Sequence, residues 1–179
     1  MLPKFPGRPL ENTRTRQTTW PQLRIGIGHD THRLESGGPL RLGGVTIDFD
    51  RHLVGHSDAD GLLHAVTDAL LGATALGDIG DHFPDTDPAN RDRDSAEMLS
   101  LVLQKIVDLG WSVVNVDCIV FAERPRLSGY KVAIRTRLAE ILGLSPDQVG
   151  LKAKTGEGVG QVGHQESIEA QAVVLLASR

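Results

Sequence analysis

Histidine and aspartate residues lie close together at two places in the first half of the chain. The first place is Asp30-Thr31-His32, and the second begins at His56 and includes Asp60, His64 and Asp68. Imidazoles and carboxylates can bind divalent metal ions and can transfer protons. These residues are therefore the first candidates for chemistry.

The spacing within each group predicts which side chains lie together. Asp30 and His32 follow an apolar strand, where positions i and i+2 point to the same side. Asp60, His64 and Asp68 are four residues apart and share one face of a helix. A surface pair and a solvated helix face are the alternative explanations. The other faces of this helix are apolar too, however, and an ionisable row is costly to bury without partners.

Two imidazoles and one carboxylate, from His32, His64 and Asp30, suit a tetrahedral zinc site. Three protein ligands leave the fourth position open, as in catalytic zinc sites. We therefore expect one Zn2+ per chain. Asp60 and Asp68 would then lie behind the ligands and orient the imidazoles through hydrogen bonds.

Three further segments suit phosphates or sugar hydroxyls. An acidic loop, with Asp78-Ile79-Gly80 and Phe83-Pro84-Asp85-Thr86-Asp87, suits a polyol or metal-bridged phosphates. Lys154-Thr155-Gly156-Glu157 offers donors to phosphate oxygens and a carboxylate for magnesium. Arg124-Pro125-Arg126-Leu127-Ser128 offers guanidinium groups and free backbone donors before a helix. Each segment alone is also explained by an ordinary exposed turn.

Strands and helices must alternate to position these groups. The patterns predict strands over 24–28, 113–121, 149–154 and 168–176, a hairpin over 39–47, and helices over 57–76, 95–109 and 130–142. Ser57 and Asp60 form an acidic variant of a capping box for the first helix. The order predicts an α+β fold, a two-layer sandwich in which helices cover one face of a mixed β-sheet. Residues 24–179 form a single domain, and residues 1–23 form a mobile basic tail.

Composition excludes several classes of protein. The 179 residues carry a net charge of −4, which gives no reason to expect a nucleic-acid partner. The apolar runs are too short to span a bilayer and the first residues contain no secretory signal, so we expect a cytoplasmic protein without a membrane partner. Cys118 is the single cysteine. It lies in an apolar run, where a buried, inert thiol is expected.

The motifs, in this order, resemble the 2-C-methyl-D-erythritol 2,4-cyclodiphosphate synthase family of the non-mevalonate isoprenoid route. The resemblance rests on Gly28–His32, His56–Asp60, His64–Gly72, Leu76–Gly80 and Phe83–Pro88. It implies a homotrimer with its sheets around the axis and active sites between neighbouring subunits. It also implies a zinc- and magnesium- or manganese-dependent phosphorus–oxygen lyase. In that reaction the 2-phosphate of 4-diphosphocytidyl-2-C-methyl-D-erythritol 2-phosphate attacks the β-phosphate and releases CMP.

The resemblance also implies roles for individual positions. Asp30, His32 and His64 would hold zinc, and Glu157 would hold Mg2+ or Mn2+. His56 and Thr155 would stabilise the transition state. The substrate-binding positions are Asp30, Thr31, His32, His56, Ser57, Asp78, Ile79, Gly80, Phe83, Pro84, Asp85, Thr86 and Asp87. The nucleotide-binding positions are Ala122, Pro125, Arg126, Leu127, Ser128, Lys154 and Thr155.

Two other functions compete with the cyclase. A metal-dependent phosphoesterase would need a general base placed for water, and a non-catalytic trimeric binding protein would need a broken ligand set. The chain departs from the family at Lys154-Thr155-Gly156, at Arg124-Pro125-Arg126, and at His164, where the family commonly has Arg. None of these changes touches the candidate metal ligands.

Overall fold

One mixed sheet forms the frame of the molecule. The computed structural model describes residues 21–179, so the predicted tail lies outside the described residues except for its last three. The strands are β1 (Leu23–Ser36), β4 (Arg51–Val54), β5 (Trp111–Phe121), β6 (Val149–Lys154) and β7 (Ser167–Ser178). Their order is β4-β1-β7-β5-β6, with β5 and β6 parallel and the other neighbours antiparallel.

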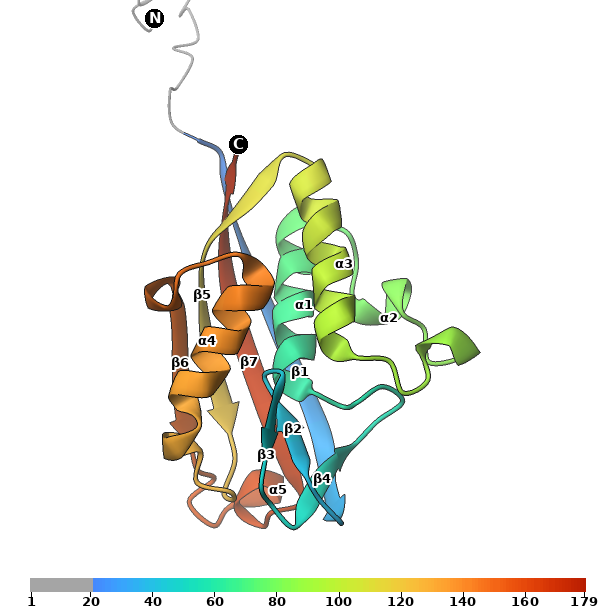
Figure 1. Cartoon of the computed structure of the whole chain (residues 1–179), viewed down its shortest axis with the longest axis vertical. Coiled ribbons are helices and arrows are strands. Elements are labelled where there is room, and N and C mark those ends of the chain that lie inside the picture. Colours follow the sequence, from blue (N-terminus) through green and yellow to red (C-terminus); the bar gives the residue numbers. More distant parts are fainter. Residues whose placement is uncertain (1–20) are drawn as a thin grey trace, which may run out of the picture.

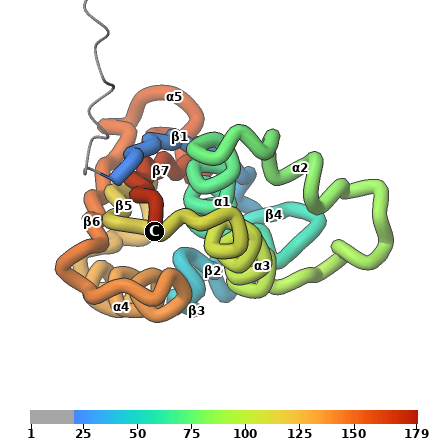
Figure 2. Tube along the Cα trace, turned by 90° about the horizontal axis from the view of Figure 1, so that it is seen from above, coloured from blue at the N-terminus to red at the C-terminus, as the bar shows by residue number. Residues whose placement is uncertain are grey.

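Three helices cover one face of this sheet, as Figure 1 shows. They are α1 (Gly61–Thr74), α3 (Ser95–Asp108) and α4 (Lys131–Leu142). The hairpin β2 (Leu40–Leu42) and β3 (Val45–Ile47) lies beside them, and α2 (Ile79–His82) and α5 (Gly160–Gly163) are single turns. In Figure 2 the three long helices lie together on one side of β1, β7 and β5. The predicted α+β fold with a mixed sheet is confirmed.

Two predicted boundaries are wrong, for physical reasons. The first strand continues to Ser36, because β7 pairs with it from Leu23 to Arg33 and β4 pairs with it from Arg33 to Ser36. The first helix begins at Gly61 and not at Ser57, since Ala59 has a left-handed backbone with φ of 56°. Asp60 caps that helix by accepting a hydrogen bond from the backbone N–H of Leu63.

Two glycines allow α1 to lie directly against β1. A Cβ atom on Gly26 would lie 1.8 Å from the carbonyl oxygen of Ala69, and one on Gly28 would lie 2.0 Å from that of Ala65. No side chain fits in so small a gap. Asp30 follows on the same face of the strand, so the same close packing brings it beneath the first turn of α1.

The opposite face of the sheet exposes an apolar patch near the start of β1. Ile25 and Ile27 are 72% and 70% exposed, Leu23 lies on the same strand, and Val173 lies beside Ile27 on β7. Inside, Cys118 is buried, and this burial, with the negative charge of Asp117, raises the pKa of its thiol to about 12. No helix within residues 21–179 is long and apolar enough to cross a membrane.

The close packing of α1 on β1 gives a first prediction. Gly28→Ala should lower the free energy of unfolding by about 1–3 kcal/mol or more, because the new methyl group overlaps the α1 backbone. Gly72→Ala, within α1, is the matched control, since the nearest atom of β1 to its Cβ would be the carbonyl oxygen of Ile27 at 3.7 Å. The control should gain about 0.5–1 kcal/mol. Equal midpoints for Gly28→Ala and the parent in urea unfolding would contradict this packing.

Candidate active site

Asp30, His32 and His64 form a compact group between β1 and α1. Asp30 Oδ2 lies 2.8 Å from His32 Nδ1 and 3.1 Å from His64 Nδ1. Each of the three residues offers one donor atom, and these atoms lie within 4.8 Å of one another. Among the described residues, this is the group of histidines and acidic residues that could hold a metal ion. The sequence prediction that these three side chains come together is therefore confirmed.

The contacts within the group fit a metal ion. Tetrahedral ligands about 2.0–2.1 Å from zinc lie about 3.3 Å apart, close to the two distances from Asp30. His32 Nδ1 is buried and has no hydrogen-bond partner, although Asp30 is so near. A Cβ on Gly61 would lie 3.2 Å from Asp30 Oδ2, so this glycine keeps the approach to the group open. Two nitrogens and one carboxylate oxygen are a donor set that zinc accepts.

Electrostatics favours the charged form of Asp30. Its burial alone would raise the pKa of this carboxyl group. The adjacent His32 and His64 outweigh that effect through their close contacts and charge, and they hold the pKa well below its usual range. Asp30 therefore stays a carboxylate, the form that binds a cation.

The far side of the His64 ring has two hydroxyl partners, and neither contact was predicted from the sequence. Nε2 lies 2.8 Å from Ser95 Oγ and 3.1 Å from Ser57 Oγ. Ser95 Oγ in turn donates to Asp58 Oδ1. Asp58 belongs to the recognised motif, but Ser95 follows the cap of a distant helix, and its spacing gives no signal of this contact.

Asp60 and Asp68 do not orient the imidazoles, contrary to the prediction. Asp60 is fully buried and accepts hydrogen bonds from the backbone N–H groups of Gly43 and Gly44, at 2.7 and 2.6 Å. Asp68 accepts from the N–H of Ile79 at 2.8 Å. Burial raises the pKa of both carboxyl groups, and these backbone donors counteract it. Both residues join α1 to neighbouring segments.

A cavity of about 380 Å³ opens in front of His32 and His64. His56 and Ser57 line it, so the structure brings these two predicted site residues to the metal group. Asn90 and Met98 also line the cavity. The acidic loop contributes Ile79, Gly80, Phe83, Pro84 and Asp85.

Three predicted residues of the acidic loop lie outside this lining. Asp78 caps α2 by accepting from the N–H of Asp81. Asp87 caps the short turn Pro88–Asn90 by accepting from the N–H of Ala89. Thr86 between them is exposed. The two aspartates thus fix the shape of the loop from which the lining residues project.

All predicted nucleotide-binding residues line a second cavity, of about 310 Å³. It lies at the ends of β5 and β6, where Glu123, Arg124, Lys131 and Ala153 also contribute. The predicted members are Ala122, Pro125, Arg126, Leu127, Ser128, Lys154 and Thr155. Four cationic side chains and one acidic side chain line this cavity, a balance that suits an anionic ligand.

Glu157 is not near the metal group of its own chain. It follows β6, which is separated from β1 by β7 and β5, and three strand spacings amount to about 14 Å. Thr155 Oγ1 donates to Glu157 Oε1 at 2.7 Å, so these two predicted residues share one turn. One chain therefore carries the site in two separate parts.

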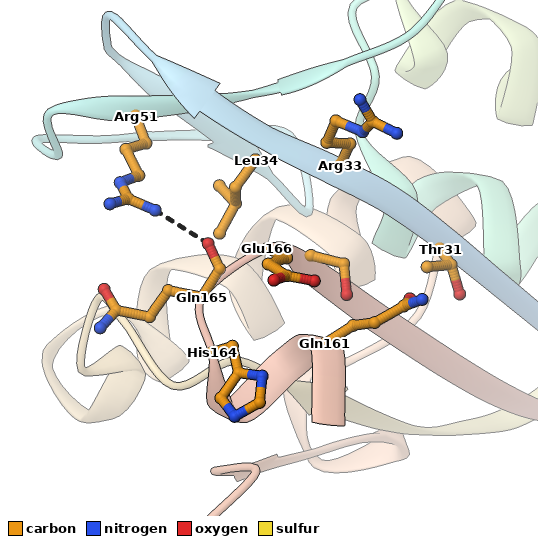
Figure 3. A pocket seen from close by; sticks show the side chains of 9 residues that line it. Thr31, Arg33, Leu34, Arg51, Gln161, His164, Gln165 and Glu166 are labelled. Atoms are coloured by element: carbon orange, nitrogen blue, oxygen red, sulfur yellow. Dashed lines mark hydrogen bonds between the residues drawn. The ribbon is translucent and has the colours of Figure 1, made fainter. Parts of the chain in front are cut away.

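Thr31, a predicted substrate-binding residue, lies on the face of β1 opposite the metal group. Successive side chains of a strand alternate, and Thr31 lies with Arg33 on the other face of β1. There it lines a third cavity, of about 480 Å³, together with Gln161 and His164. Figure 3 shows this cavity, in which Arg51 donates a hydrogen bond to the carbonyl oxygen of Gln165.

Comparison with known proteins supports one family. A profile of the YgbB family matches residues 23–177. A relative from Laribacter hongkongensis, named 2-C-methyl-D-erythritol 2,4-cyclodiphosphate synthase, is 57% identical over 157 residues, 88% of this chain and 97% of that protein. A solved synthase of the same name with CDP bound is 40% identical, has a TM-score of 0.80, and matches over 86% of this chain and 99% of its own.

A longer protein also contains this fold. The bifunctional IspDF from Campylobacter jejuni is 36% identical with a TM-score of 0.85 over 88% of the present chain. That match covers 43% of the Campylobacter protein, so the present chain spans less than half of its length. The region that the family profile matches, residues 23–177, contains the metal group and the cavities lined by His56 and by Arg126.

Removal of one imidazole tests the metal group. His64→Ala should reduce bound divalent metal from one ion per chain to a small fraction, as measured by elemental analysis after dialysis. Alanine favours helix, so circular dichroism should be unchanged. His52→Ala is the control, since His52 contacts the carbonyl oxygen of Gly37 and lies outside the group. Full metal content in the His64 variant would refute the assignment.

Proposed function

The chain belongs to the YgbB family, and from this premise we propose that it converts 4-diphosphocytidyl-2-C-methyl-D-erythritol 2-phosphate to 2-C-methyl-D-erythritol 2,4-cyclodiphosphate and CMP. The observation that carries the proposal is the metal group itself, of which His32 and His64 lie in the wall of a cavity that His56 and Ser57 also line. The relatives that match almost the full length of the folded region bear the name of this synthase.

The reaction needs no nucleophile from the protein. An oxygen of the 2-phosphate forms a bond to the β-phosphorus, and the bond from that phosphorus to the oxygen bridging the α-phosphate breaks. CMP leaves with the bridging oxygen and its electron pair, and no water is consumed. The protein must hold two anionic groups in line and offset their charge, which are the main contributions to phosphoryl transfer.

Asp30, His32 and His64 would hold zinc, since their donor set and spacing suit that ion. When bound, the ion would act as a Lewis acid toward a phosphate oxygen. His56 and Ser57 lie in the same cavity wall and would donate hydrogen bonds to the phosphates. The backbone of Ile79–Gly80 and the loop from Phe83 to Asp85 would enclose the erythritol carbon chain and bind its hydroxyl groups.

The second cavity would take the cytidine diphosphate end of the substrate. Arg126 and Lys154 would pair with its phosphates, and Ala122 and Leu127 leave room for a flat base. Glu157, whose carboxylate accepts a hydrogen bond from Thr155, would hold a second cation, Mg2+ or Mn2+, which would offset phosphate charge. The two cavities lie far apart within one chain. A ligand that occupies both must therefore bind the metal-side cavity of one subunit and the nucleotide cavity of another.

A homotrimer explains this division of the site. The exposed apolar face of the sheet, with Leu23, Ile25, Ile27 and Val173, is the kind of surface that a subunit interface covers. In a closed ring every subunit uses the same two edges, so the metal part of one subunit meets the nucleotide part of the next. Three complete active sites would then form around one axis.

Phosphorus NMR of a single incubation tests the proposed reaction. With the substrate, zinc and magnesium, the protein should release CMP and form a cyclic diphosphate in equal amounts. His64→Ala protein purified in the same way controls for contaminating enzymes. Inorganic phosphate without the cyclic product would instead assign a phosphoesterase, and no turnover by zinc-loaded protein would assign a binding protein.

A further inference from the structure

The imidazole of His64 is held from both sides. Nδ1 faces Asp30 Oδ2 at 3.1 Å, on the side of the metal group. Nε2 faces Ser95 Oγ at 2.8 Å, on the side of α3. A neutral imidazole has one N–H donor and one acceptor nitrogen, so the partner of Nε2 decides which nitrogen is free to bind metal.

The hydroxyl of Ser95 has only one hydrogen to give. Asp58 Oδ1 receives that hydrogen bond, and a carboxylate has no hydrogen to return. The remaining lone pairs of Ser95 Oγ face Nε2, so the ring must donate from Nε2. Nδ1 is then left with its lone pair pointing toward Asp30 and His32, where a metal ligand has to point.

Asp58 is itself fixed in place. Its Oδ1 also accepts from the backbone N–H of Asp60 at 3.3 Å, and its own N–H donates to the carbonyl oxygen of Arg93. Its other oxygen lies 3.3 Å from Nε of Arg41, which comes from β2. Arg41 also reaches Asp94, the cap of α3, at 3.7 Å. The loop before α1, the start of α3 and the hairpin therefore hold this carboxylate in one orientation.

Ser57 cannot replace Ser95 in this role. Its hydroxyl lies farther from Nε2, at 3.1 Å, and already accepts from the backbone N–H of Ala59. Ser57 is also partly exposed in the substrate cavity, whereas Ser95 is completely buried. The Ser95 hydroxyl is buried, and the hydrogen bond that it donates and the one that it accepts are both fixed. It therefore constrains the orientation of the His64 ring more strongly than Ser57 does.

We propose that Ser95 is a positioning residue for the metal ligand His64, and that Asp58 acts through it by fixing the direction of the Ser95 hydroxyl. This inference rests on the proposed function only in taking the metal group as the place where zinc binds. It predicts that Ser95 determines zinc affinity although it lies behind the ligand and does not touch the ion.

Zinc affinity of the full-length protein tests the inference. Ser95→Ala should bind zinc roughly 10–100-fold more weakly in competition with a chromogenic chelator, the usual consequence of losing a partner behind a ligating histidine. Ser100→Ala, on the same helix, removes a hydroxyl that bonds only to the carbonyl oxygen of Ala96 and should leave zinc affinity unchanged. Ser95→Thr keeps the hydroxyl and should recover most of the loss.

A double-mutant cycle separates positioning from general loosening of the fold. If Asp58 acts through Ser95, Asp58→Ala should weaken zinc binding in the parent and have little further effect in Ser95→Ala. Nitrogen NMR of zinc-loaded protein labelled in histidine should show the proton of His64 on Nε2 and none on Nδ1. Unchanged zinc affinity in Ser95→Ala, additive effects in the cycle, or a protonated Nδ1 would each overturn the proposal.

These measurements do not depend on the substrate. A protein that loses zinc affinity on Ser95→Ala but forms no cyclic diphosphate would keep the positioning role and lose the proposed function. If the parent cyclises the substrate while Ser95→Ala retains full zinc affinity, the proposed function stands and the positioning role of Ser95 is refuted.

Discussion

The rest of the site depends on the close contact between α1 and β1. At Gly26 and Gly28 the backbone of the helix occupies the space that side chains would need. Asp30 and His32 extend the same face of the strand just beyond these glycines, where the first turn of α1 presents His64. Larger residues at the glycine positions would move the helix away from the strand. A shift of one or two ångströms would separate the three donor atoms, because metal–ligand bonds tolerate only small errors.

Three aspartates near the N-terminus of α1 serve different purposes because their surroundings differ. Asp30 lies between two imidazoles, and their proximity keeps it charged despite its burial. Asp60 is buried more deeply but accepts three backbone N–H groups, so it ties the hairpin turn to the helix. Asp58 holds the Ser95 hydroxyl. All three residues are aspartates, so the residue type does not distinguish their roles. The partners of each carboxylate determine its role.

The sequence predicted the parts of the site that depend on local spacing. The i, i+2 relation brought Asp30 and His32 to one face, and the hairpin predicted over 39–47 contains β2 and β3. The same alternation would have shown that Thr31 faces the other way. The contact of His64 with Ser95 joins residues that are 31 positions apart. It depends on how α3 packs against α1, which no spacing rule in a single sequence reports. The role predicted for Asp60 was wrong because its helical spacing from His64 suggested a shared function, whereas its carboxylate binds the backbone amides of the hairpin.

The central claim is that the metal part and the nucleotide part of the site act together only across neighbouring subunits. Co-refolding two defective variants tests it most directly, with His64→Ala affecting the first part and Arg126→Glu the second. Each variant alone should be inactive, and a one-to-one mixture should regain about a quarter of the parental rate of CMP release, the fraction of subunit contacts that join two intact parts in random trimers. No recovery of activity, when mass spectrometry shows that mixed oligomers have formed, would contradict the account.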